Sequence, residues 1–243
     1  MRFEYKYIVP NTKLAKLREM IAPFVQLDKY AQQKGGEYTV RSIYFDTPEL
    51  ECYREKIAGV KRRNKVRLRG YNGGGSGDTV FFEIKKKVEE PLFKNRVSMT
   101  FAEALKTLEG REATDVLASE NARRFLYHLY ARRMQPVVTV IYEREPFQAL
   151  LKDRDNDLRI TFDKNLRAVP FPTVENLYQE ESARLVDGAN FIMEVKFNQY
   201  LPTWVKTVIA SFGLSKGPAS KYAMCVETLG LTNVRPYHNN PIQ

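Results

Sequence analysis

Cysteine and histidine are scarce in this chain of 243 residues, which has two of each. Cys52 and Cys225 are too few for a disulfide framework or a thiolate zinc cluster, and His128 and His238 exclude a multi-histidine metal site. Long apolar runs are also missing, because none approaches the ~20 residues that span a bilayer. Any catalysis must therefore use Lys, Arg, Glu, Asp or Tyr.

Negative charge is in short supply: 39 Lys and Arg residues face 29 Asp and Glu residues, a formal net charge of +10. This surplus favours an anionic partner such as nucleic acid, phosphates or an acidic membrane surface. Hydrophobic residues still make up 43% of the chain and aromatic residues 12%, so we expect a sizeable core. The charged start at Arg2 is unlike a secretory leader, and no segment looks like a linker. We therefore predict one cytoplasmic domain over residues 1–243.

Alternation of polar and apolar residues with a period of two predicts about eight strands, mostly joined by hairpin-length turns. They cover residues 2–9, 38–45, 61–71, 78–88, 93–99, 136–147, 158–163 and 190–197, with a further extended segment around 149–152. Helical spacing predicts helices over residues 11–24, 101–108, 115–134, 203–212 and 220–229. The fold class is thus α+β: an antiparallel sheet that closes into a barrel, with helices packed outside.

The glycine-rich segment 72–78 lies between two predicted strands and invites comparison with a phosphate-cradling loop. No Gly-Lys-Ser/Thr follows it, and no helix is predicted after it. We predict a hairpin tip.

Ionisable side chains share one face of several predicted strands, and apolar side chains occupy the other. The ionisable faces hold Arg67 and Arg69, Glu83 and Lys85, Tyr142 and Arg144, Arg159 and Asp163, and Glu194 and Lys196. In an ordinary sandwich these faces would point to water. We favour the opposite arrangement, because amphipathic helices need an apolar surface to cover. Buried like charges repel and lose hydration, so such a barrel makes sense only around an anion.

Eight short strings carry a more specific signal. They are EYKY (4–7), RSIYFD (41–46), KVRLR (65–69), EIK (83–85), YER (142–144), RITFD (159–163), MEVKF (193–197) and SKY (220–222). In this order and spacing they resemble the polyphosphate polymerase domain of the vacuolar transporter chaperone (VTC) complex, a branch of the triphosphate tunnel metalloenzymes. The resemblance covers Arg2 to about Leu229. It implies a closed tunnel whose basic interior binds triphosphate and polyphosphate, and the synthesis of polyphosphate from ATP with a divalent metal, Mn²⁺ or Mg²⁺.

The same resemblance implies roles for individual residues. The catalytic cations would be Lys6, Arg67, Arg69, Lys85, Arg144 and Arg159. The substrate-binding residues would be Lys94, Tyr142, Ser220 and Lys221, and the metal ligand would be Glu194. Lys196 follows Glu194 on the same strand face, and we count it with the substrate-binding residues as a supporting partner. These residue types suit phosphoryl transfer, which needs positioning and neutralisation of charge more than covalent chemistry. Arg62 and Lys86 alternate out of phase with these residues, so we expect them outside.

Two departures from the family pattern matter. Arg2 stands where the wider tunnel family often has the first Glu of Glu-x-Glu-x-Lys, which disfavours a metal-rich hydrolytic site. The chain also starts at the first strand, so we do not expect the inositol-phosphate-sensing domain or the membrane helices of the fungal complex. Regulation and product export are therefore not inherited from the resemblance.

The leading hypothesis is an ATP-dependent polyphosphate polymerase. A triphosphatase acting on tripolyphosphate or nucleoside triphosphates is the second hypothesis, and a non-catalytic polyphosphate-binding module is the third. Specific nucleic-acid binding is disfavoured, because the aromatic residues alternate as core rather than as exposed stacking platforms. The oligomeric state and any membrane partner stay open.

Overall fold

The computed structural model describes residues 2–88, 92–110, 119–151 and 156–233, with side chains at all of these positions except 87, 88 and 92–94. Residues 115–118 of one predicted helix, and Lys152 of the predicted extended segment, lie outside this part of the chain. Leu150 and Leu151 of that segment form a bend after a strand, so the separate strand predicted there is wrong.

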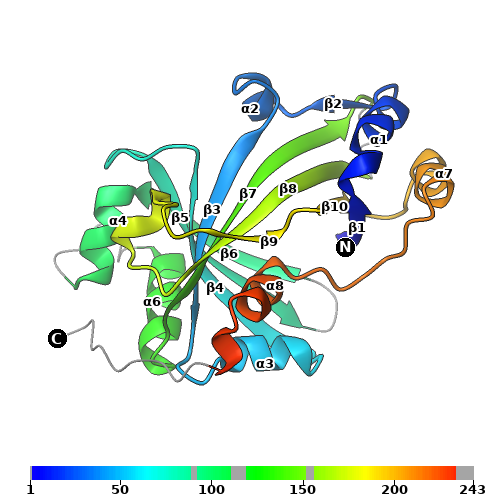
Figure 1. Ribbon diagram of the computed structural model, residues 1–243. Helices are drawn as coiled ribbons and strands as arrows, with labels where there is room; N and C mark the ends of the chain where they lie inside the picture. Colours follow the sequence, from blue (N-terminus) through cyan, green and yellow to red (C-terminus); the bar gives the residue numbers. More distant parts are fainter. Residues whose placement is uncertain (1, 89–91, 111–118, 152–155, 234–243) are drawn as a thin grey trace. The chain divides into compact units, whose positions relative to one another are not determined.

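Strands and helices are mixed along the chain, with runs of consecutive strands between the helices (Figure 1). The strands are β1 (Phe3–Pro10), β2 (Val25–Leu27), β3 (Tyr38–Asp46), β4 (Arg62–Tyr71), β5 (Thr79–Val88), β6 (Leu92–Thr100), β7 (Gln135–Ala149), β8 (Arg159–Pro170), β9 (Arg184–Asp187) and β10 (Asn190–Phe197). The helices are α1 (Leu14–Ile21), α2 (Lys29–Gln32), α3 (Glu51–Ile57), α4 (Phe101–Leu108), α6 (Glu120–Ala131), α7 (Thr203–Ser211) and α8 (Lys221–Thr228). Short 3-10 helices are η1 (Asn11–Lys13), η2 (Glu175–Tyr178) and η3 (Leu231–Asn233).

The sheet has ten strands in the order β1-β10-β8-β7-β3-β4-β5-β6, with β2 beside β7 and β9 beside β8. The α+β class and the antiparallel pairing are confirmed. The closed barrel of about eight strands is wrong, because within the described residues β1 and β6 remain the two ends of the sheet. Alternation reports which face of a strand is buried, whereas closure depends on strand tilt and on pairing between edge strands. The short strands β2 and β9 are missed because three or four residues show no clear period.

The chain divides into two compact units. Unit 1 contains residues 1–39, 142–167 and 185–220, and unit 2 contains residues 40–141, 168–184 and 221–243. Strands β3, β7, β8 and β9 contribute residues to both units. Each unit has its own apolar core, and the single domain stays a prediction.

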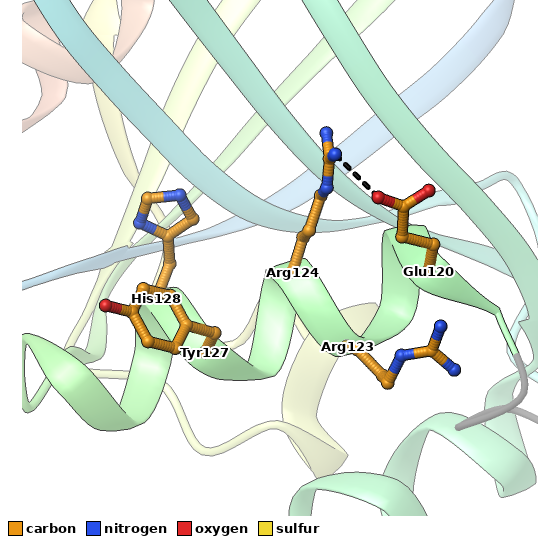
Figure 2. Close-up of a pocket in the computed structure, with 5 residues that line it drawn as sticks. All are labelled: Glu120, Arg123, Arg124, Tyr127 and His128. Carbon is orange, nitrogen blue, oxygen red and sulfur yellow. Dashed lines mark hydrogen bonds and ion pairs between the residues drawn. The ribbon is translucent and has the colours of Figure 1, made fainter.

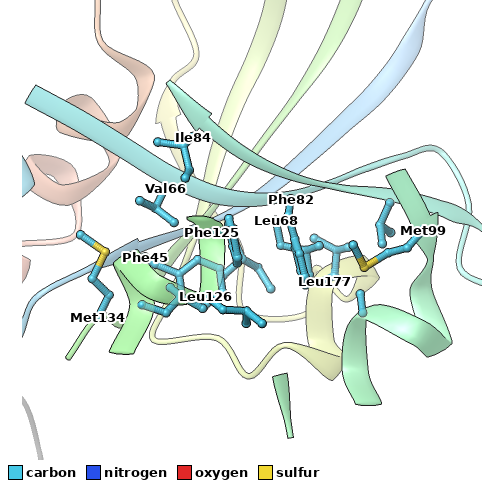
Figure 3. Packing of buried hydrophobic residues seen from close by; sticks show 14 of the residues in the cluster. Phe45, Val66, Leu68, Phe82, Ile84, Met99, Phe125, Leu126, Met134 and Leu177 are labelled. Atoms are coloured by element: carbon cyan, nitrogen blue, oxygen red, sulfur yellow. The ribbon is translucent and has the colours of Figure 1, made fainter. Parts of the chain in front are cut away.

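In unit 2, helices α4 and α6 cover the apolar face of strands β3, β4 and β5. The ring of Phe125 on α6 lies against the ring of Phe82 on β5 (Figure 3). The two rings are stacked, with centroids 4.2 Å apart and planes 2° from parallel. Phe125 also meets the ring of Phe45 on β3 edge to face at 5.9 Å. Val66 and Leu68 of β4 are fully buried in the same cluster. Their strand therefore directs its ionisable side chains to the other face.

In unit 1, helices α1 and α7 lie next to each other and pack on the apolar face of β1, β8 and β10 (Figure 1). Leu17 of α1 and Val205 of α7 are buried there with Val195 of β10. Phe162 of β8 contacts the rings of Phe147 and Phe191 edge to face at 5.2 Å. The prediction that amphipathic helices cover the apolar strand faces is confirmed in both units.

The glycine-rich segment joins β4 to β5 as a hairpin tip, as predicted. The carboxylate of Asp78 accepts hydrogen bonds from the amides of Gly74 (2.6 Å) and Gly75 (2.7 Å). The loop amides thus bind a carboxylate of the loop itself. Among the described residues, every helix is too short or too polar to cross a membrane.

The stacking of Phe125 generates a stability prediction. We expect Phe125→Ala to lower the free energy of unfolding by about 3–5 kcal/mol, because it removes a ring that is 1% exposed and leaves a cavity. Urea denaturation followed by circular dichroism measures this loss. Tyr127→Ala, on the same helix but at a position that is 69% exposed, is the matched control and should change stability little. Equal losses in the two variants would contradict the packing described here.

Candidate functional site

Both faces of strand β4 are buried along its middle. Val66 and Leu68 are shielded by the helices, while Arg67 and Arg69 on the opposite face are only 4% and 6% exposed. Arg62 and Lys86, predicted to lie outside, are exposed. The cationic face of β4 is therefore not an ordinary solvated surface, and its buried charges need partners.

The arginine cluster of unit 2 consists of Arg67, Arg69 and Arg96 around the carboxylate of Glu83. Glu83 has no exposed surface, and its Oε2 lies 2.7 Å from Nε of Arg67. Nε of Arg69 is 4.0 Å from Oε2, and Nε of Arg96 is 3.3 Å from Oε1. One carboxylate thus stands among three guanidinium groups, which leaves a local excess of positive charge.

Strand register explains how these arginines are oriented. Tyr44 of β3 lies opposite Arg67, and Ser42 lies opposite Arg69. Nη1 of Arg67 donates a hydrogen bond to the Tyr44 hydroxyl (2.8 Å), and Nε of Arg69 donates to Oγ of Ser42 (3.0 Å). Hydrogen bonds of this kind fix the plane of each guanidinium.

Lys85 and Lys94 continue the same face, because they are paired across β5 and β6. Lys85 is half-buried, whereas the side chain of Lys94 lies outside the described part. Sequence reasoning gave Glu83 no site role and did not single out Arg96. The alternation of the strands could have identified both residues. Glu83 is two positions from Lys85, and Arg96 is two positions from Lys94, so each lies on the same strand face as a predicted site residue.

The pKa of Tyr71 on β4 is affected by the positive charge of the arginine cluster. Burial alone raises the pKa of its hydroxyl, but the nearby charges of Arg69, Arg96 and Arg67 lower it, and the net pKa lies below the ordinary tyrosine value. The lowered pKa shows that the positive charge outweighs both burial and Glu83 at this position.

The glutamate cluster of unit 1 consists of Lys6, Arg144 and Lys196 around Glu194. Oε1 of Glu194 lies 3.3 Å from Nζ of Lys6, and Oε2 lies 3.2 Å from Nζ of Lys196. Nη2 of Arg144 is 3.4 Å from Oε2. Register brings the first pair together, because Lys6 of β1 lies directly opposite Glu194 of β10.

Arg144 is held by a second carboxylate that sequence reasoning placed on an ionisable face without a role. Its Nε and Nη2 donate to the two oxygens of Asp163 at 2.6 and 2.7 Å, a bidentate pair. Burial by itself lowers the pKa of Arg144, but Asp163 raises it, and the net pKa lies well above the ordinary arginine value. The ring of Tyr142 lies 5.2 Å from the guanidinium carbon. The charge of Arg144 is therefore permanent and its orientation is fixed.

Arg159 differs from the other predicted cations. It lies opposite Lys196 in the register of β8 and β10, but its Nη2 pairs with Oδ2 of Asp28 at 2.7 Å. Asp28 also caps α2 by accepting a hydrogen bond from the amide of Ala31. The guanidinium of Arg159 is thus drawn towards α2.

Ser220 and Lys221 are 5% and 8% exposed, and Lys221 opens helix α8. The next residue, Tyr222, anchors the helix, because its hydroxyl donates a 2.5 Å hydrogen bond to Asp46. Burial and the carboxylate of Asp46 raise the pKa of Tyr222, so the hydroxyl stays protonated as a donor. The ring of Tyr222 stacks on that of Tyr44 at 5.0 Å. Since Tyr44 binds Arg67, the start of α8 is tied to the arginine cluster.

Any metal in this protein would depend on carboxylate oxygens. In residues 2–88, 92–110, 119–151 and 156–233, no group of three His, Cys, Asp or Glu side chains is arranged to hold a metal ion. Glu4 and Glu194 do flank one ammonium group, with carboxylate oxygens 3.0 and 3.3 Å from Nζ of Lys6. Mg²⁺ is often bound by one or two carboxylates, with substrate phosphates completing its coordination. The pair fits a site of that kind and does not fit an all-protein cage.

A separate pocket lies on α6 and is lined by Glu120, Arg123, Arg124, Tyr127 and His128, as Figure 2 shows. Arg124 pairs with Glu120 at 2.6 Å along the helix. Burial, with the charges of Arg132 and Lys86, lowers the pKa of His128. The expectation that aromatic residues serve only as core is wrong here, because Tyr127 points outward on a helix face that packing leaves open.

The fold and the two clusters define an α+β protein whose antiparallel strands bury cations on their polar faces. A solved structure with a similar fold is that of the putative adenylyl cyclase HpAC1 from Hippeastrum, which is described as having a dominant triphosphatase activity. The two chains are 15% identical, the match covers 95% of this chain and 96% of the other, and the TM-score is 0.50. A family model of the VTC domain matches residues 1–230. This chain belongs to the VTC domain family, which confirms the resemblance seen in the sequence.

The burial of Glu83 leads to a second stability prediction. We expect Glu83→Gln to lower the free energy of unfolding by about 3–5 kcal/mol, because it leaves buried arginines without their counter-charge. Urea denaturation at low ionic strength measures the loss. Glu120→Gln, which removes the exposed partner of Arg124, is the control and should have little effect. A Glu83→Gln variant as stable as the control would mean that the cluster does not need its carboxylate.

Proposed function

We propose that this protein is a metal-dependent polyphosphate polymerase that transfers the γ-phosphate of ATP to a growing polyphosphate chain. The observation that carries the proposal is the buried excess of positive charge in the arginine cluster, on a strand face of a VTC domain. A buried surplus of guanidinium groups is stabilised when a polyanion binds, and phosphate groups suit their geometry.

In this proposal, the cations position phosphates and neutralise the charge that develops during transfer. Arg67 and Arg69 each donate hydrogen bonds to phosphate oxygens from a guanidinium group whose plane is fixed. The remaining cations of the proposal are Lys6, Lys85, Arg144 and Arg159. The residues proposed to hold the rest of the substrate are Lys94, Tyr142, Lys196, Ser220 and Lys221.

The proposed metal ligand is Glu194, which shares the ammonium group of Lys6 with the carboxylate of Glu4. Glu194 would hold a Mn²⁺ or Mg²⁺ ion, which would supply positive charge to offset that of the phosphates. The terminal oxygen of polyphosphate is already anionic, so it can attack the γ-phosphorus without a general base. The bond between the γ-phosphorus and the bridging oxygen then breaks, and ADP leaves with the electron pair.

Hydrolysis of a triphosphate is the second candidate function. The same neutralisation of charge serves when water attacks in place of polyphosphate. The triphosphatase activity described for the Hippeastrum protein makes this outcome worth measuring directly. A polyphosphate-binding module without turnover is the third candidate.

The products of turnover separate these candidates. We expect the full chain, incubated with ATP and Mn²⁺ or Mg²⁺, to release ADP and to place the lost phosphate in polyphosphate. Anion-exchange separation of ADP, polyphosphate and orthophosphate measures this balance. ADP with orthophosphate alone would favour a nucleoside triphosphatase. No ADP from ATP, together with no orthophosphate from tripolyphosphate, would favour the binding module.

Strand register supplies a control for this assay. Arg69→Gln should abolish turnover, whereas Arg62→Gln on the same strand should leave it nearly unchanged, because Arg62 is exposed and out of phase. Similar losses in both variants would contradict the assignment of the buried face.

A further prediction concerns the metal. We expect Glu194→Gln to reduce turnover at least about 100-fold, because charge neutralisation by a metal ion contributes several kcal/mol to transfer. Binding of polyphosphate in chelator should persist or tighten, since a negative charge is lost. Turnover against Mn²⁺ concentration and calorimetric binding measure the two effects.

The control for this experiment is Glu143→Gln. Glu143 is also in unit 1, but its carboxylate pairs with Arg167 at 2.7 Å rather than with the glutamate cluster. This variant should keep its metal requirement. Full turnover with an unchanged metal requirement in Glu194→Gln would rule out Glu194 as the essential ligand.

A further inference from the structure

One guanidinium of the arginine cluster is stacked on an aromatic ring. The Cζ atom of Arg96 lies 3.4 Å from the ring centroid of Phe81, which is the contact distance of stacked planes. Oε1 of Glu83 is 3.3 Å from Nε of Arg96 and restrains the group within its plane. The side chain of Arg96 is 36% exposed, against 5% for Arg67 and 8% for Arg69. Arg96 is therefore a fixed, planar cation that still reaches solvent.

A second aromatic ring completes this corner of the strand face. Tyr71 meets Phe81 edge to face, with centroids 5.8 Å apart. The guanidinium carbon of Arg69 lies 6.0 Å from the centroid of Tyr71. Phosphate binding needs cations and donors but no aromatic surface. A planar cation backed by an aromatic ring, next to buried arginines, fits a ligand that joins a flat π system to phosphates.

We propose that Arg96 and Phe81 form a platform for the nucleobase of a nucleoside triphosphate. The base stacks on the solvent-facing side of the Arg96 guanidinium, and the phosphates extend towards Arg67 and Arg69. Nucleobases commonly stack on arginine planes and on aromatic rings. The inference rests on the proposed function for the phosphate-binding role of Arg67 and Arg69.

The platform predicts which triphosphates this protein should bind most tightly. The strength of stacking depends on the area of the base and not on the hydrogen-bonding groups at its edges. ATP and GTP should therefore bind with similar affinity, and both should bind more tightly than UTP. Tripolyphosphate has no base and gains nothing from the platform. A nucleoside triphosphate is then the preferred triphosphate of this protein.

The competing explanation is that Arg96 serves only as one more charge for phosphate or for Glu83. Two substitutions separate charge from shape. Arg96→Lys keeps the positive charge and removes the plane, and Phe81→Leu keeps Arg96 but removes the ring beneath it. Both positions lie on strand faces that do not enter the apolar core between the sheet and α6.

The experiment is calorimetric binding of ATP and of tripolyphosphate to the full chain in chelator, where turnover does not interfere. We expect each substitution to weaken ATP binding about tenfold, within the range found for loss of one base stack. The affinity for tripolyphosphate should change less than about twofold. Thermal unfolding of each variant shows whether it is folded, and Arg96→Lys, being partly exposed, carries the test if Phe81→Leu is unstable.

Several outcomes would overturn the platform. One is an equal loss of affinity for ATP and tripolyphosphate, which would mean that Arg96 acts through charge. Another is an unchanged affinity for ATP in both variants. If the unaltered protein binds tripolyphosphate as tightly as ATP, the platform fails while the proposed function stands. If it binds neither ligand, both proposals fail.

Discussion

A single buried carboxylate, Glu83, holds the arginine cluster of unit 2 together. Glu83 stands among three arginines, so the cluster keeps an excess of positive charge. In the glutamate cluster of unit 1, Glu194 shares its cations with Glu4, which pairs with Lys6, and with Asp163, which pairs with Arg144. Without these carboxylates the cations of either cluster would repel one another in surroundings with little water. The two clusters thus differ in charge: the carboxylates of unit 1 offset its cations more completely than Glu83 offsets the three arginines of unit 2.

Rigid supports keep the cations of unit 2 in place. The carboxylate of Asp46 accepts hydrogen bonds from the amides of Cys52 and Tyr53 in the first turn of α3, and from the hydroxyl of Tyr222. Tyr222 in turn stacks on Tyr44, the partner of Arg67. Chemistry that depends on charge placement benefits from such preorganisation, because the groups need not rearrange when the substrate arrives.

Phosphoryl transfer and hydrolysis make the same demands on these clusters. Both reactions need several cations around the phosphates and a metal that offsets charge. They differ in which nucleophile reaches the γ-phosphorus, and that difference depends on access for a polyphosphate end or for water. Membership of the VTC domain family fits both reactions, and a nucleobase platform at Arg96 would suit ATP as the substrate of either one.

Which residues share a strand face could be predicted from the sequence alone. Period-two alternation placed Arg67 and Arg69 opposite Val66 and Leu68, and the structure buries both sets. It could not determine the number of strands or whether the sheet closes, because closure depends on tilt and edge pairing. The pairing of each carboxylate with its cation, and the stacking of Arg96 on Phe81, became visible in the folded chain. The physical reason is that such contacts join different strands, so they follow from register and packing rather than from the local order of residues.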